Sequence, residues 1–108
     1  TEEVSQKIRE VLNIPVLGIA AGRGLDGQLL ISYDLLDLYE WPGNVTPKHF
    51  TAYAAPEAGW TGGDFVLAAY RWYVRAVKNG EFPGQENAHV LSGKDREAIE
   101  AYLASFVK

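Results

Sequence analysis

Two apolar runs separated by a glycine-rich loop constrain the fold of this chain more than any other feature of its sequence. Residues Val16–Ala20 and Gln28–Tyr33 are predicted to be short strands, and the loop between them is rich in glycine. The first run has no polar alternation, which is typical of a parallel strand buried on both faces. The second run is ambiguous, since residues 29–38 also fit a helix.

Helical patterns precede and follow these runs. The predicted helices are residues 2–12, a turn over Asp34–Tyr39, Thr46–Ala54, Thr61–Lys78 and a last helix that begins at Ser92. Thr61 and Asp64 have the spacing of a capping box, and Thr46 followed by Pro47 has the chemistry of a helix start. The last helix has an apolar face that consists of Ile99, Leu103 and Phe106.

This order of elements contains at most two strands. Two parallel strands cannot satisfy the hydrogen-bonding groups at their own outer edges, and a two-stranded sheet is rarely stable alone. We therefore expect an α/β chain that forms part of a larger sheet.

The composition excludes several classes of protein. The chain has 108 residues, about one domain, and 47% of them are hydrophobic, enough for a packed core. Its net charge of -4 and its scattered Lys and Arg argue against nucleic acid as a partner. It has no cysteine, and no apolar run approaches the ~20 residues of a membrane span. We expect a cytoplasmic protein that binds neither nucleic acid nor membrane.

Several segments together point to a known family. IPVLGIAAGRGLDGQLLISYDLLDL is followed by TPKHF and, after a helix, by AVKNGEFPGQENAH. In order and spacing these segments resemble the C-terminal part of the ketopantoate hydroxymethyltransferase family over about Thr1–His89. Residues 90–108 are then an extra C-terminal helix. The sequence departs from the family pattern at Ala20, at Tyr33 and at residues 87–89.

The resemblance implies a (β/α)8 TIM barrel with Val16–Ala20 as its seventh strand and Gln28–Tyr33 as its eighth. It also implies transfer of a one-carbon unit from methylenetetrahydrofolate to 3-methyl-2-oxobutanoate, which forms ketopantoate, with Mg2+ bound. In the family the metal ligands and the catalytic base precede this segment, so the resemblance places none of them here. It implies a missing N-terminal barrel half as partner, an inactive isolated fragment, and a homo-oligomer as the complete enzyme.

Four residues are candidates for the rim of the active site: Gly22, Arg23, Gly24 and Asp34. They follow the two predicted strands, and the active sites of barrels lie at the C-terminal ends of their strands. Other roles stay open. The glycines also suit a simple turn, Arg23 suits a solvated loop, and Asp34 suits the cap of a helix.

Two further hypotheses compete with an enzyme fragment. One is a noncatalytic binding or oligomerisation module derived from the same barrel, which the departures at Ala20 and Tyr33, the extra helix and the many aromatic residues favour. The other is a small independent enzyme or phosphate-binding protein built on the glycine loop, although no acid/base pair accompanies that loop.

Overall fold

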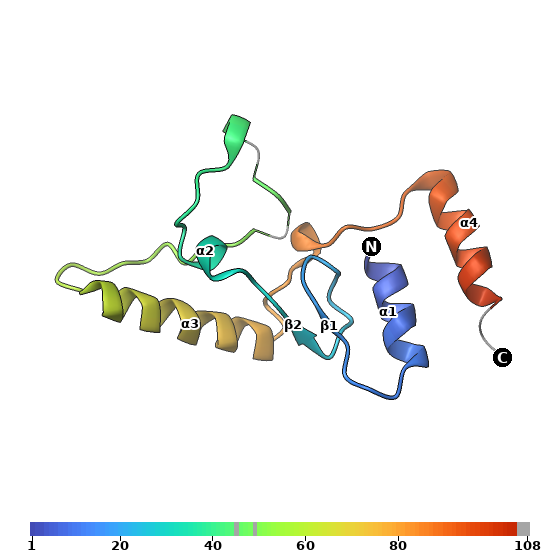
Figure 1. Ribbon diagram of the computed structural model, residues 1–108, viewed down its shortest axis with the longest axis horizontal. Helices are drawn as coiled ribbons and strands as arrows, with labels where there is room; N and C mark the ends of the chain where they lie inside the picture. Colours follow the sequence, from blue (N-terminus) through green and yellow to red (C-terminus); the bar gives the residue numbers. More distant parts are fainter. Residues whose placement is uncertain (45, 49, 106–108) are drawn as a thin grey trace.

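The computed structural model describes residues 1–44, 46–48 and 50–105, and it shows helices around one small pair of strands (Figure 1). In chain order the elements are α1 (Glu2–Val11), β1 (Leu17–Gly18), β2 (Gly27–Gln28), α2 (Ser32–Leu35), the 3₁₀ turn η1 (Pro42–Asn44), α3 (Gly62–Lys78), the 3₁₀ turn η2 (Gln85–Asn87) and α4 (Gly93–Ala104). Helix α3 lies on one side of the strands, while α1 and α4 pack together on the other. The chain is thus α/β, as predicted.

The two strands pair in parallel, with Leu17 opposite Gly27. This confirms the predicted parallel pair, but both strands are shorter than predicted. Only two residues of Val16–Ala20 are in a strand, and of Gln28–Tyr33 only Gln28 is. Within the described residues neither strand has a second neighbour, so little holds the backbone extended beyond this pair.

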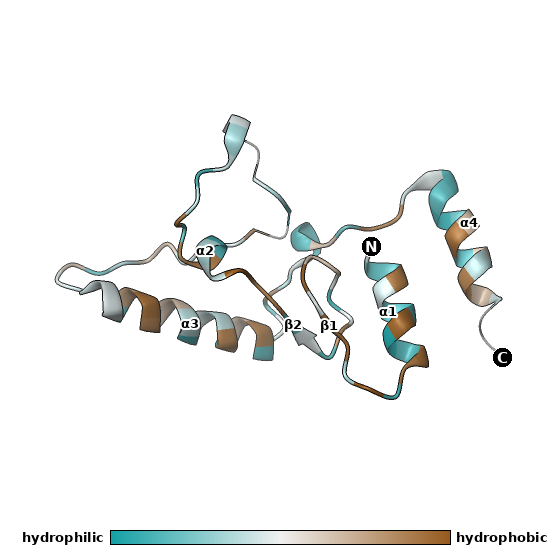
Figure 2. Ribbon diagram, in the orientation of Figure 1, coloured by the Kyte–Doolittle hydropathy of each residue, from teal (hydrophilic) through white to brown (hydrophobic). Residues whose placement is uncertain are grey.

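The apolar residues around the strands are largely uncovered. Leu17 is 58% exposed and Leu29 is 51% exposed. In Figure 2 apolar colour runs along the chain near β1 and from β2 to α2. The predicted burial of the first strand on both faces is therefore wrong for this chain by itself, because the described residues do not supply a layer for each face.

Helix α3 begins with the predicted capping box. The hydroxyl Oγ1 of Thr61 accepts the N–H of Asp64 at 3.2 Å, and the carboxylate of Asp64 accepts the N–H of Thr61 at 2.9 Å. Two backbone donors that the helix leaves unpaired are thereby satisfied. The first and last predicted helices are also confirmed, as α1 and α4. Phe106, part of the apolar face predicted for the last helix, lies outside the described residues.

Helix α2 begins earlier than predicted. It spans Ser32–Leu35 and not Asp34–Tyr39, because Ile31 occupies the N-cap position and its carbonyl accepts the N–H of Leu35 at 3.0 Å. The eighth strand is predicted to extend to Tyr33, but its last two residues, Ser32 and Tyr33, belong to α2. The helical alternative for this segment is correct for these four residues.

The helix predicted over Thr46–Ala54 is wrong for the part of that range that the structure describes, residues 46–48 and 50–54. That part contains a turn in which the N–H of Phe50 donates to the carbonyl of Pro47 at 3.0 Å. The N–H of Tyr53 donates to the carbonyl of Leu35 at 2.9 Å. One backbone donor of this segment is thus paired with α2 and not within a helix, and a helix this short is marginal without packing.

The buried core of the described chain is small. Its apolar members are Leu35, Ala69, Ala76, Phe82, Ala88 and Leu91. The radius of gyration is 16.8 Å, against about 13 Å for a compact domain of this length. An open chain with so few buried side chains has apolar surface available for further packing. No helix among the described residues is both long and apolar enough to cross a membrane.

Candidate functional site

The C-terminal ends of β1 and β2 lie at the same edge, because the strands are parallel. A third segment, which follows α3, returns to this edge. Together they line a small hollow, which we call the strand-end hollow, with a volume of about 10 Å³. Its lining residues are Ala20, Ala21, Gly22, Gln28, Leu29, Phe82, Pro83 and Asn87. The structure thus brings together the glycine loop and the Phe-Pro-Gly segment, which are some sixty positions apart.

Gly22 is buried at this hollow and its position admits no side chain. Its φ is +99°, and a Cβ placed on it would lie 2.8 Å from the Cα of Glu2. Its carbonyl accepts a hydrogen bond of 3.0 Å from Nε2 of Gln28. Glycine is therefore required here both by the backbone conformation and by the close approach of α1.

Arg23 holds a carboxylate, that of Glu2 at the start of α1. Its backbone N–H donates to Oε1 at 2.9 Å, its Nε donates to Oε1 at 2.8 Å, and its Nη2 donates to Oε2 at 3.0 Å. The Glu2 side chain is only 12% exposed. The Arg23 donors are thus directed at Glu2, in the bidentate geometry that favours carboxylates.

The other two rim candidates lie elsewhere. Gly24 is exposed beside Gln6 of α1. Asp34 lies in the first turn of α2 and is 3% exposed. It is not the N-cap, because Ile31 occupies that position. Neither lines the strand-end hollow or the neighbouring hollow of about 180 Å³ that Arg23 borders. Of the four candidates, Gly22 alone lines the strand-end hollow.

Sequence reasoning missed two residues that shape this edge. The hydroxyl of Tyr73 on α3 donates to the carbonyl of Gln28 at 2.7 Å, and burial raises the pKa of Tyr73. Its ring lies 5.7 Å from that of Phe82. Tyr73 is recognisable in the sequence only as one of several residues on a helix face, whereas its contact with β2 depends on where α3 packs.

The described residues contain no group of three His, Cys, Asp or Glu side chains that could hold a metal ion. The described part of this chain therefore does not fit a complete Mg2+ site, which needs several oxygen ligands. We derive no catalytic step through a metal from these residues.

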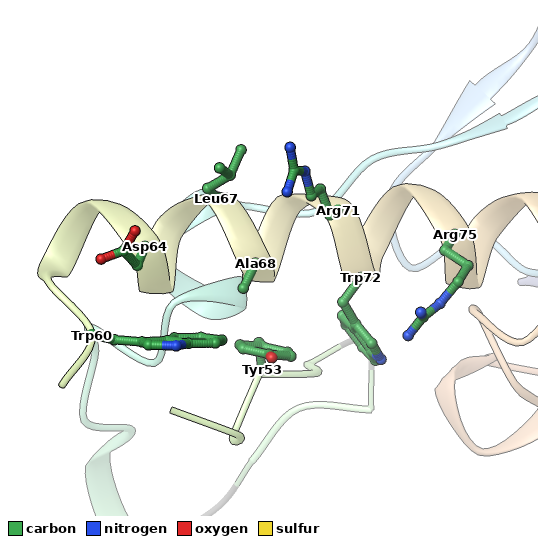
Figure 3. Close-up of a pocket in the computed structure, with 8 residues that line it drawn as sticks. All are labelled: Tyr53, Trp60, Asp64, Leu67, Ala68, Arg71, Trp72 and Arg75. Atoms are coloured by element: carbon green, nitrogen blue, oxygen red, sulfur yellow. The ribbon is translucent and has the colours of Figure 1, made fainter. Parts of the chain in front are cut away.

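A larger hollow, of about 400 Å³, lies beside α3. Its lining residues are Tyr53, Trp60, Asp64, Leu67, Ala68, Arg71, Trp72 and Arg75. Figure 3 shows the rings of Tyr53, Trp60 and Trp72 on one side of the helix, with Arg71 on the other. The Tyr53 and Trp72 rings are 6.2 Å apart. None of the rim candidates lines this hollow, so its aromatic residues belong to the packing of α3 and not to the strand-end site.

The Glu2–Arg23 pair makes stability depend on pH. Hydrogen bonds from the Arg23 side chain hold the pKa of Glu2 below its usual range. A lowered pKa in the folded state contributes stability above the pKa of the unfolded chain, about 4.3, and that stability is lost as the pH falls through the folded pKa. We expect the denaturation midpoint of the wild type to fall more between pH 6 and pH 3 than that of Glu2→Gln. Equal losses, measured by urea unfolding, would contradict this role of the pair.

A parallel strand pair with a glycine loop and the Phe-Pro-Gly segment at its carboxyl edge is typical of an α/β protein whose sites lie beyond the strand ends. Residues 1–85 match the model of a family described as ketopantoate hydroxymethyltransferase. The chain belongs to this family, which confirms the resemblance found in its sequence.

Individual relatives agree with this assignment. The chain is similar to 3-methyl-2-oxobutanoate hydroxymethyltransferases from Caldicellulosiruptor bescii (38% identical over 86 residues), Halorhodospira halophila (40% over 84) and Kosmotoga olearia (35% over 94). These matches cover 80%, 78% and 87% of this chain, but 29%, 27% and 32% of the respective relative. The chain therefore spans less than a third of the length of these relatives.

Proposed function

We propose that this chain forms the C-terminal part of a ketopantoate hydroxymethyltransferase barrel, with β1 and β2 as its seventh and eighth strands. The observation that carries the proposal is the family match over residues 1–85, combined with a parallel pair that has no further strand beside it in the described chain. In this proposal residues 1–89 belong to the barrel and residues 90–108 are an addition. The remaining strands come from an N-terminal barrel half, in the same gene product or a separate chain.

The reaction of the assembled barrel would be that named for the relatives, hydroxymethyl transfer to 3-methyl-2-oxobutanoate. Methylenetetrahydrofolate is the one-carbon donor, and ketopantoate, an intermediate of pantothenate biosynthesis, is the product. We propose that the catalytic base and the Mg2+ ligands belong to the N-terminal half. We also propose that Gly22, Arg23, Gly24 and Asp34 contribute to the rim of the assembled site, although in this chain only Gly22 lines the strand-end hollow. The enzyme would be a cytoplasmic homo-oligomer.

The size of the strand-end hollow supports the proposal that the chain alone is inactive. Its volume of about 10 Å³ is far below the about 300–1,000 Å³ of ordinary ligand pockets. The hollow can enclose neither a keto acid nor a folate. Other strands would have to complete its walls, and the exposed apolar residues beside β1 and β2 are available to contact them.

A complementation assay tests this function. We expect ketopantoate to form when the chain is mixed with the Caldicellulosiruptor bescii relative shortened by the segment that matches this chain, and not with either component alone. The measured quantity is ketopantoate released from 3-methyl-2-oxobutanoate and methylenetetrahydrofolate in the presence of Mg2+. Full activity of the isolated chain would overturn the requirement for a second barrel half.

One observation favours the alternative, a noncatalytic assembly module. Helix α3 presents four exposed large hydrophobic side chains, those of Val66, Leu67, Tyr70 and Val74. Leu67 is 50% exposed and Val74 is 49% exposed. Such a stripe is suited to contact another protein surface. A complex with the shortened relative that forms without producing ketopantoate would support this module. A folded monomer in light scattering, with and without the shortened relative, would contradict both functions.

A further inference from the structure

The first turn of α1 holds two different segments of the chain with two consecutive glutamates. Glu2 contacts the glycine loop through Arg23, as described above. Glu3 contacts the segment that follows the family match, residues 88–104, which we call the C-terminal segment. Since successive helical residues are about 100° apart around the axis, one rigid turn can hold both at once.

The contact of Glu3 with the C-terminal segment is a network of charge-assisted hydrogen bonds. Its two carboxylate oxygens accept the N–H of Leu91, each at 3.1 Å, and Oε1 also accepts Nη2 of Arg96 at 2.6 Å. Arg96 donates further to the carbonyl of Leu91, from Nε at 3.3 Å and from Nη2 at 3.2 Å. Leu91 is 9% exposed. The guanidinium of Arg96 therefore ties Glu3 to a buried part of the C-terminal segment.

Glu2, which holds the glycine loop, also forms a hydrogen bond with the C-terminal segment. The backbone N–H of Glu2 donates to the carbonyl of His89 at 2.8 Å, while the carboxylate of Glu2 accepts from Arg23. The Cα of Glu2 also lies against Gly22. A displacement of the first turn of α1 would therefore move both the C-terminal segment and the loop at the strand-end hollow.

We propose that the C-terminal segment is a clamp that fixes the glycine loop at the strand-end hollow through the adjacent pairs Arg96–Glu3 and Glu2–Arg23. Arg96 and Glu3 are positioning residues, since neither lines the hollow. The segment lies beyond residues 1–85, the part that the family model matches. The clamp is independent of the proposed function, because it concerns the order of the loop and not the reaction.

Hydrogen exchange of the full chain tests the clamp at one amide, the N–H of Arg23, which donates to Glu2. Arg96→Met keeps the apolar stem of the side chain and removes its donors. We expect exchange at Arg23 to accelerate about tenfold, the change that corresponds to losing a charge-assisted contact, while the buried amides of Ala69 and Ala76 in α3 keep their rates.

A matched control distinguishes loss of the Arg96–Glu3 contact from a general effect of altering a charged pair on α4. Arg96 also lies 3.7 Å from Glu100, one turn further along α4. Glu100→Gln removes this weaker pair and leaves Glu3 in place, so it should leave exchange at Arg23 unchanged. If Arg96→Met left Arg23 unchanged, or accelerated Arg23 and α3 equally, the clamp would be disproved, since equal acceleration indicates global loss of stability.

A second variant keeps the test decisive if Arg96→Met does not fold. Glu3→Gln retains the shape of the side chain and weakens both of its contacts with the C-terminal segment. It should also accelerate exchange at Arg23 selectively, although Glu3 makes no hydrogen bond with the loop in the described structure. Where both single variants fold, the effect of the double variant on exchange at Arg23 should be smaller than the two single effects combined, because both variants remove the Arg96–Glu3 pair. Additive effects would contradict a single clamp.

Discussion

Replacing Gly22 with alanine is expected to lower the free energy of unfolding by about 2 to 5 kcal/mol, the largest effect of any glycine substitution we foresee in the loop. Two terms contribute. A left-handed backbone disfavours a β-carbon by about 1 to 2 kcal/mol, and forcing an extra carbon into a packed contact adds about 1 to 3 kcal/mol. The contact is severe because the new Cβ would lie 2.8 Å from the backbone Cα of Glu2, which cannot rotate away.

Gly80→Ala is the matched control for this substitution. Gly80 has a φ of +71°, but a Cβ on it would meet no heavy atom within 4 Å. Only the conformational term applies, so we expect a loss of about 1 to 2 kcal/mol. Urea unfolding followed by tryptophan fluorescence measures both variants. Equal losses in the two would show that the approach of α1 to the loop contributes nothing to stability.

Replacing Leu35 with alanine is expected to lower the free energy of unfolding by about 2 to 4 kcal/mol, since it removes a buried side chain and leaves a cavity. Leu35 is 2% exposed and is the largest fully buried side chain among the described residues. It lies in α2, which packs against α3. The variant should therefore also loosen the neighbouring Asp34, whose position depends on the same short helix.

Leu38→Ala serves as the control because it deletes the same atoms from an exposed site. Leu38 is 61% exposed, so we expect a change of at most about 0.5 kcal/mol. The difference between the two denaturation midpoints isolates the effect of burial. A similar change in both variants would mean that α2 is not packed in solution as it is in the structure.

The candidate site was predictable in part. The glycine loop and Asp34 follow the predicted strands in the sequence, and the structure places Gly22 at the strand-end hollow. The sequence did not reveal that Arg23 holds Glu2, or that the Phe-Pro-Gly segment and Tyr73 meet the same edge. Such contacts depend on how helices pack, and no local pattern encodes them.

The sequence by itself determined the long helix with its capping box, the first and last helices, the parallel character of the two strands and the family. Each of these rests on short-range periodicity or on ordered motifs, which act within a few residues. Only the tertiary structure decided where the strands end, that residues 46–48 and 50–54 form no helix, and that Glu3 holds residues 91 and 96. A strand continues only where a neighbour accepts its hydrogen bonds, and a contact between residues 93 positions apart forms only once the chain has folded.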